Sequence, residues 1–265
     1  MTPVPPPPPA SPAPPAPRRD PAAEAIGRLT RRAFLVGGVA AAAGLGGWAW
    51  LRRQQVVGGI PWPLRQVHRV NEWVGRGLYS GGRLAPEFDP ARAGEPMVNG
   101  NHGRPDAADP AGWTLTVTQP GVAPRTFRQS EAAALPRVEM TTEFKCIEGW
   151  SQVVTWSGVR LADFVAANGL GRRPDGTAYD YVALETADGA YYVGLDTPSA
   201  LHPQTLLCDA MNGAPLTVAH GAPLRVVLTV KYGIKNIKWP ATLRFQDELP
   251  ADYWAERGYD WYSGL

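Results

Sequence analysis

The chain has 265 residues, with 26 lysines and arginines against 24 aspartates and glutamates. Seven of the basic residues but only two of the acidic ones lie within residues 1–53, so the rest of the chain has a formal charge of −3. This balance excludes the clustered basic face that a nucleic-acid partner requires. The remaining length, about 210 residues, is enough for one well-buried domain without disulfides or zinc.

The N-terminal part predicts a tail followed by a targeting segment. Eleven of the 28 prolines fall within residues 1–21, so we expect residues 1–29 to form a proline-rich, disordered tail. Residues 30–53 contain paired arginines at 31–32 and a charge-free run at 36–51. This pattern resembles a twin-arginine export signal. The 19 uncharged residues 33–51 are also long enough to remain as an anchor in the inner membrane.

We therefore expect the protein to be periplasmic or otherwise extracytoplasmic, exported by the twin-arginine route. Whether the signal is cleaved or kept as an anchor stays open. Residues 54–265 are predicted to form a single domain of the α+β class, dominated by strands. Alternating side chains and turn signals predict strands at 113–118, 138–144, 181–186, 191–195, 224–230 and 237–245. Helices are expected at 161–168 and 251–257.

Several cofactor classes are excluded by inspection. The chain has no glycine-rich dinucleotide fingerprint and no phosphate loop, so neither a nicotinamide nor an ATP site is indicated. With only two cysteines, Cys146 and Cys208, the sequence also lacks the motifs for covalently attached haem and for cysteine-ligated iron–sulfur clusters. Any redox cofactor must be of another kind.

The two cysteines have different surroundings. Cys208 lies in the apolar stretch 205–211, which is typical of an inert core thiol. Cys146 follows a predicted strand and stands next to Lys145, whose ammonium favours the thiolate that ligates metals or attacks electrophiles. A disulfide between the two cysteines is the alternative for an exported protein.

Three motifs together resemble the sulfite oxidase family of molybdopterin-dependent oxidoreductases. They are Lys-Cys-Ile-Glu-Gly-Trp-Ser at 145–151, Trp-Ser-Gly-Val at 156–159 and Lys-Tyr-Gly-Ile-Lys-Asn-Ile-Lys at 231–238. Within the family, the exported branch typified by the catalytic subunit of the periplasmic protein-methionine-sulfoxide reductase is the most similar. The resemblance runs from about residue 71 to 245. It implies the strand-rich sulfite-oxidase-like fold and one molybdenum-molybdopterin per chain.

The resemblance also implies site residues. Cys146 would ligate molybdenum through its thiolate, a soft ligand that suits this metal. Arg225 suits bidentate capture of the pterin phosphate, in a stretch that Lys231, Lys235 and Lys238 make locally basic. The expected cofactor-binding residues are Asn71, Cys146, Thr186, His220, Arg225, Asn236, Ile237 and Lys238. Glu148, the second expected catalytic residue beside Cys146, would move a proton during the reaction. A structural role at a turn is the alternative for Glu148.

The implied activity is a two-electron oxygen-atom transfer, in the direction that reduces a sulfoxide or a related S-oxide or N-oxide. The substrate would be a small molecule or a protein-bound oxidised group. Because the chain has no haem, flavin or iron–sulfur motif, another protein must supply the electrons. The resemblance to the reductase branch implies that this donor is a membrane protein of the haem type. His220 agrees with the sulfite oxidases rather than with the reductase branch, so sulfite-oxidase-like oxidation is the alternative.

Two interpretations from other classes remain open on the sequence. A cysteine hydrolase would use Cys146 as nucleophile and His220 as base, and it would need no metal. An exported, non-catalytic binding domain would join Cys146 to Cys208 in a disulfide.

Overall fold

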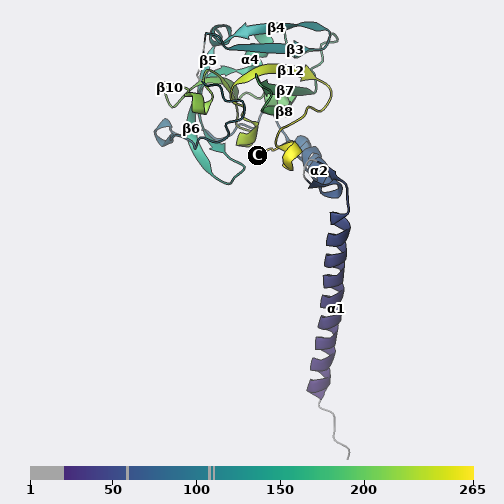
Figure 1. The fold of residues 1–265 in the computed structure, drawn as a ribbon. Coiled ribbons are helices and arrows are strands. Elements are labelled where there is room, and N and C mark those ends of the chain that lie inside the picture. Colours follow the sequence, from purple (N-terminus) through teal and green to yellow (C-terminus); the bar gives the residue numbers. More distant parts are fainter. Residues whose placement is uncertain (1–20, 58–59, 107–108, 110) are drawn as a thin grey trace, which may run out of the picture. The chain divides into compact units, whose positions relative to one another are not determined.

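The computed structural model describes residues 21–57, 60–106, 109 and 111–265, and it divides into two units, residues 1–54 and 55–265 (Figure 1). In the first unit, helix α1 (Pro21–Arg52) contains a stretch, Arg32–Arg52, that is long and apolar enough to cross a membrane. α1 includes residues 21–29, which the sequence analysis assigned to the disordered tail. Proline is well tolerated in the first turn of a helix, and alanines follow it here. The expectation for residues 1–20 lies outside the described residues.

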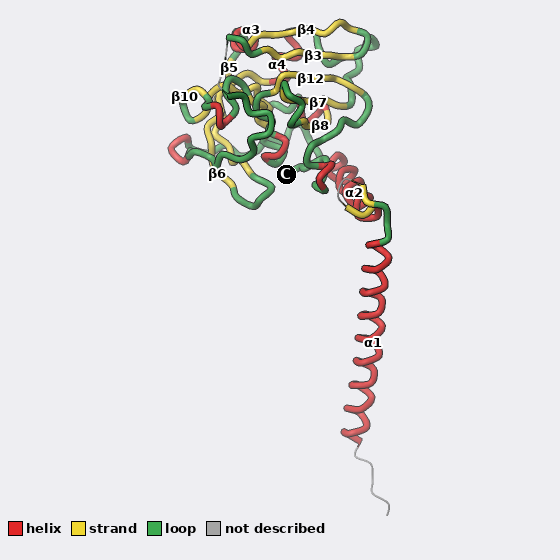
Figure 2. The backbone as a smooth tube through the Cα atoms, in the orientation of Figure 1, coloured by secondary structure: helices red, strands yellow, loops and turns green. Residues whose placement is uncertain are grey.

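The second unit contains two five-stranded sheets (Figures 1 and 2). In the first sheet the order is β10 (Ala214–Pro215), β9 (Thr205–Met211), β6 (Ser151–Arg160), β5 (Arg137–Lys145), and β11 (Arg225–Leu228) also pairs with β9. In the second sheet it is β4 (Val122–Arg128), β3 (Thr114–Gln119), β12 (Pro240–Gln246), β7 (Tyr181–Thr186), β8 (Tyr192–Asp196). The β3–β12 pair is parallel, and the other named strand pairs are antiparallel. A short hairpin, β1 (Val56–Val57) and β2 (Ile60–Pro61), precedes both sheets.

One longer helix, α2, precedes the sheets, and short helices fill the connections between strands. The α-helices of this unit are α2 (Trp62–Leu78), α3 (Gln129–Ala133), α4 (Leu161–Ala167) and α5 (Thr197–Ala200). Single 3-10 turns occur at η1 (Pro90–Arg92), η2 (Val218–His220), η3 (Gly233–Lys235) and η4 (Ala255–Arg257). Figure 2 shows how much of the remaining chain is loop.

The main core lies between the sheets. Side chains along β9 alternate between two hydrophobic clusters. Leu207 packs into the main core with second-sheet residues such as Leu184, whereas Leu206 and Cys208, on the other face of the strand, pack into a second cluster around Trp156. The first sheet is therefore covered on both faces. Its strands are held rigidly, and the loops that follow them can place side chains accurately.

The structure corrects two expected elements. Residues 251–257 form only the 3-10 turn η4, because the Asp252 carboxylate accepts hydrogen bonds from the main-chain N–H groups of Trp254 and Ala255 and Gly258 ends the turn at φ 99°. The strand expected at 237–245 starts at Pro240, after Trp239 adopts a φ of 54°.

Candidate active site

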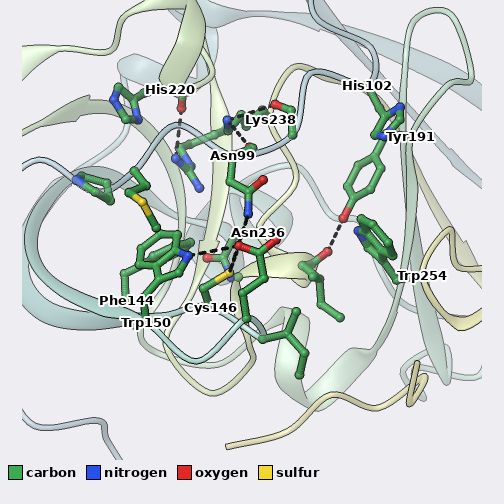
Figure 3. Close-up of a pocket in the computed structure, with 18 of the residues that line it drawn as sticks. Asn99, His102, Phe144, Cys146, Trp150, Tyr191, His220, Asn236, Lys238 and Trp254 are labelled. Atoms are coloured by element: carbon green, nitrogen blue, oxygen red, sulfur yellow. Dashed lines mark hydrogen bonds between the residues drawn. The ribbon is translucent and has the colours of Figure 1, made fainter. Parts of the chain in front are cut away.

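A single open cavity collects most of the expected site residues (Figure 3). Its wall combines the loop 96–102, the turn that follows β5, the first residue of β11 and residues 233–239. These segments are far apart in the sequence, so only the folded sheets bring them together.

Cys146 lies on a tight turn directly after β5. Its N–H donates to the carbonyl of Trp150 at 2.9 Å, and its carbonyl accepts from Gly149 N–H at 3.1 Å. Gly149 has a φ of 93°, a conformation that glycine adopts without strain. The turn fixes the thiol in the cavity wall (Figure 3).

The environment of this thiol differs from the expectation. Burial raises the pKa of Cys146, so the neighbouring ammonium does not favour a free thiolate as we expected. Lys145 lies at the end of β5, where its Nζ pairs with Glu143 at 3.6 Å instead. A metal ion bound directly to the sulfur would favour the thiolate despite this burial.

One carboxylate lies beside the sulfur. Glu148 Oε2 accepts hydrogen bonds from Asn99 Nδ2 at 2.9 Å and from Trp150 Nε1 at 3.2 Å. The same oxygen is 3.8 Å from Cys146 Sγ, and Asn99 Nδ2 is 3.9 Å from that sulfur. Two donors therefore hold the Glu148 carboxylate at the position where it can exchange a proton with a molecule bound near Cys146.

Two cations define the opposite part of the wall. Arg225 is buried; its Nη1 donates to the His220 carbonyl at 3.1 Å, whereas its buried Nε has no partner. Lys238 Nζ donates to the carbonyls of Asn99 at 2.7 Å and Ala219 at 2.8 Å. Burial lowers the pKa of Arg225 to about 10 and that of Lys238 to about 7.

Within the part of the chain that the structure describes, no carboxylate pairs with either cation. Burying unneutralised positive charge is costly. An unpartnered guanidinium nitrogen and a lysine held only by carbonyls therefore fit an anionic group such as the phosphate of a pterin cofactor, with the Cys146 sulfur as a soft metal ligand.

His220 lies at the end of η2 and lines the same cavity. Burial lowers the pKa of its imidazole, and its Nε2 lies 3.0 Å from Glu95 Oε1. The hydrogen-bond partners of Cys146 Sγ among the described residues are Asn99 and Glu148. The cysteine hydrolase interpretation required contact between His220 and the thiol, and this geometry does not provide it.

The alternative with a disulfide is contradicted, because Cys146 and Cys208 are both free. Cys208 is fully buried in β9, and burial raises the pKa of its thiol to about 12. This environment confirms the prediction of an inert core thiol.

Five of the eight expected cofactor-binding residues line the cavity, namely Cys146, His220, Arg225, Asn236 and Lys238, as does Glu148. The other three are not among the lining residues. Asn71 is exposed on α2, and Thr186 is buried at the end of β7, where its hydroxyl donates to Asp188 Oδ1 at 2.7 Å. Ile237 has its side chain in the main core. Roles for these three stay predictions.

Sequence reasoning missed Asn99 and an aromatic part of the wall. Asn99 precedes Gly100, and this Asn-Gly pair signalled a turn but not its approach to Cys146. Tyr191 and Trp254 line the cavity with His102, and the Tyr191 hydroxyl donates to the Ile234 carbonyl at 2.5 Å (Figure 3). No local pattern distinguishes these aromatic residues from core residues.

A strand-rich fold with a buried cysteine and two basic groups without carboxylate partners among the described residues, all in one cavity, fits an oxidoreductase that binds an anionic pterin cofactor. The oxidoreductase molybdopterin binding domain family matches residues 102–254, so the chain belongs to this family and is an enzyme. This match confirms the expected membership of the sulfite oxidase family and the expected α+β fold class.

Named relatives extend the match. The chain is 31% identical over 204 residues, 76% of each chain, to a protein of Azospira oryzae provisionally named protein-methionine-sulfoxide reductase subunit YedZ1. It is 34% identical over 125 residues to the protein-methionine-sulfoxide reductase catalytic subunit MsrP of Xanthomonas campestris pv. campestris, a match that covers 44% of this chain and 39% of MsrP. The crystal structure of the sulfane dehydrogenase SoxCD from Paracoccus pantotrophus superposes with a TM-score of 0.49 at 18% identity, over 63% of this chain and 49% of that one.

Proposed function

We propose that this protein reduces a sulfoxide, or a related S-oxide or N-oxide, at one molybdenum-molybdopterin per chain outside the cytoplasm. The names of the relatives support a sulfoxide substrate. The observation that carries the proposal is the position of Cys146 in a cavity that also holds Glu148 and the unneutralised cations Arg225 and Lys238.

The residues divide the binding of the cofactor between them. Cys146 would supply the metal ligand, and Arg225 with Lys238 would hold the anionic end of the pterin. His220 and Asn236 lie in the same wall. When bound, the cofactor supplies two-electron oxygen-atom transfer. The overall reaction consumes a sulfoxide, two electrons and two protons, and it yields a thioether and water.

The chain's own contribution is proton delivery and substrate binding. The Glu148 carboxyl group can hold a proton near the reacting atoms on Oε1, because Asn99 and Trp150 donate to Oε2 and fix the orientation of the group. Tyr191 and Trp254 offer an apolar wall for the organic groups of the substrate. Solvent can enter because Glu148 is exposed at the mouth of the cavity.

The N-terminal unit supports a proposal for the location of the protein, and the family resemblance supports one for its partner. We propose that the twin-arginine pair directs export and that the stretch Arg32–Arg52 anchors the chain in the inner membrane. Trp48 and Trp50 near the end of this stretch suit the interfacial region of a bilayer. A haem-type membrane protein would then supply the electrons, and the substrate would be small or protein-bound.

The test compares wild type with Cys146→Ala and with Cys208→Ala as a matched control. We expect about one molybdenum and one pterin per chain in wild type and in Cys208→Ala, together with reduction of a model sulfoxide by a reduced dye. Cys146→Ala should lose the activity, with its metal lost or its paramagnetic signal changed.

Two results would overturn the proposal. Well-folded wild type that carries neither molybdenum nor pterin would remove the cofactor. Wild type that holds the cofactor but oxidises sulfite and leaves sulfoxides unchanged would reverse the direction of the reaction in favour of sulfite-oxidase-like oxidation.

A further inference from the structure

Helix α2 packs against the rest of the second unit through its polar side. Arg65, His68, Glu72 and Arg76 recur every three or four residues and share one face. Arg65 Nη1 donates to a main-chain carbonyl at 2.6 Å, and His68 Nδ1 lies 3.5 Å from Asp260 Oδ2.

Two further contacts fix the same face. The Arg76 guanidinium lies 4.8 Å from the centre of the Tyr181 ring and pairs with Glu72 at 3.0 Å. A Cβ atom at Gly75 would lie 2.7 Å from the Tyr262 ring, so this ring packs directly against the helix backbone. The polar face is therefore the one that is covered by protein.

The opposite side of α2 is apolar and faces away from the protein. Val67, Val70, Trp73 and Leu78 are between 54 and 75% exposed, and Leu64 and Val74 extend this surface. None of the 17 residues of α2 is buried. A helix on a globular protein in water normally has the reverse arrangement, with its apolar stripe against the core. Figure 1 shows α2 at the periphery of its unit.

Chain connectivity limits what can cover this apolar face. The N–H of Trp62, the first residue of α2, donates to the carbonyl of Gln55 at 2.8 Å, because the β1–β2 hairpin folds the chain back on itself. Gln55 is three residues beyond Arg52, the last residue of α1, so covalent geometry keeps these two within about 11 Å. Wherever α1 ends in a bilayer, α2 therefore begins close to the same surface.

We propose that α2 lies in the plane of the lipid–water interface of the membrane that anchors α1, with the face that contains Val67, Val70 and Trp73 in the lipid. This inference rests on the proposed membrane anchoring of residues 32–52. An apolar face with tryptophan and leucine beside arginines is the pattern of an interfacial helix. Arg65 and Arg76 are used in contacts with the protein, but the third arginine of α2, Arg69, is exposed outside that face, so anionic headgroups match the free charge of the helix.

Such a helix would have a consequence for the enzyme. A single membrane span leaves an attached domain free to tumble, whereas a second contact through α2 fixes which side of the domain faces the bilayer. The polar contacts of α2 make this contact rigid, because they connect the helix to Tyr181 in β7 and to the C-terminal segment.

The experiment measures the depth of single labels in the full-length protein, reconstituted into vesicles of three parts phosphatidylcholine to one part phosphatidylglycerol. A nitroxide is attached to Val70→Cys on α2, to Leu249→Cys as a matched control, or to Leu45→Cys in α1, each in a Cys208→Ala background. Leu249 is a suitable control because it is an apolar residue of the body with 52% exposure, against 58% for Val70. Protein without an added cysteine gives the background from Cys146.

For each label we compare the collision rate with oxygen, which dissolves in lipid, with the collision rate with a water-soluble nickel chelate. We expect the oxygen-to-nickel ratio at position 70 to be about tenfold higher than at position 249. A label at position 70 that is as accessible to nickel as the label at 249 would overturn the inference, while a lipid-embedded label at 45 would leave the anchor intact. A label at position 45 that is also in water would overturn both the membrane anchor and the interfacial position of α2. Protection of position 70 only at high protein-to-lipid ratio, with spin–spin broadening, would identify a second copy as the occupant instead. Molybdenum content of the same samples reports separately on the proposed function.

Discussion

The same substitution, lysine to methionine, at Lys238 and at Lys235 tests whether Lys238 is a cofactor-binding cation of the cavity. Lys235 is buried, and its Nζ lies 2.5 Å from Asp252 Oδ2 and 3.0 Å from the Gly194 carbonyl. Lys238 donates only to main-chain carbonyls. Replacing each lysine with methionine keeps most of the side-chain volume and removes the charge.

The two variants should differ in stability. Lys235→Met leaves the Asp252 carboxylate buried without its cation, which costs about 3–5 kcal/mol. Burial lowers the pKa of Lys238 from 10.5 to about 7, and this difference corresponds to about 5 kcal/mol against the charged form. Because Lys238 is partly exposed, solvent screening reduces the figure to about 2 kcal/mol. Lys238→Met removes this cost but also loses the hydrogen bonds to the carbonyls, which offsets most of the gain. The free energy of unfolding of Lys238→Met should therefore stay within about 1 kcal/mol of wild type.

The pH dependence gives a second measurement. Below pH 7 Lys238 is protonated in both the folded and the unfolded chain, so the full cost of burying its charge is present. Between pH 7 and 10.5 the unfolded chain binds more protons than the folded one, and the free energy of unfolding rises with pH. The stability of cofactor-free wild type relative to Lys238→Met should therefore increase by up to about 2 kcal/mol as the pH rises through this window.

The assay is urea denaturation of the cofactor-free proteins at pH 6 and pH 9.5, together with molybdenum and pterin analysis of the proteins as isolated. Lys238→Met should lose cofactor at nearly unchanged stability, whereas Lys235→Met should lose stability and, where it folds, retain cofactor. If Lys238→Met lost 3 kcal/mol or more at pH 6 and still held the cofactor, Lys238 would be a structural residue and the reasoning from unneutralised charge would be refuted.

Three further predictions test the fold and the site. Gly158→Ala should lower the free energy of unfolding by more than about 3 kcal/mol or prevent folding, because the new Cβ would lie 2.1 Å from the Leu207 carbonyl oxygen. Gly77→Ala, whose new Cβ would point into open space, should raise the free energy of unfolding by up to about 1 kcal/mol, and thermal unfolding measures both variants. Cys208 should resist alkylation at pH 8 until the protein unfolds, and rapid modification of the native protein, measured by mass spectrometry, would contradict its burial. Glu148→Gln should keep full molybdenum content and lower kcat about 100-fold, since an amide cannot hold the proton; an unchanged kcat would leave Glu148 without the proposed role.

Local patterns predicted six of the twelve strands in the described residues. The segment 181–186 alternates and forms β7 at the same residues, because half-buried strands record their two faces in the sequence. The helix at 161–168 was equally visible, and α4 ends one residue earlier. β9 was missed, because a strand buried on both faces shows no alternation.

Helix α2 was also missed, for a different reason. Its apolar residues do recur at helical spacing, but they come shortly after the apolar segment 33–51. Nothing in the sequence indicated which surface a second apolar helix face would contact. The site was predictable where a motif is local, as at Cys146 and Glu148. Asn99 could not be assigned, because its contact with the sulfur depends on the folding of a loop 47 residues away in sequence.

The lysines of residues 231–238 show why charge in a sequence does not by itself identify a binding site. All three looked equally basic, yet Lys231 pairs with Asp196 at 3.2 Å and Lys235 pairs with Asp252. Among the described residues, Lys238 is the one of the three without a carboxylate. Together with Arg225 it leaves two basic groups in the cavity wall that have no carboxylate partner in the described part of the chain. They suit a phosphate ester, because a bound anion favours the protonated form of Lys238. The folded structure thus neutralises Lys231 and Lys235 and leaves Lys238 and Arg225 as the basic groups that we propose for the cofactor.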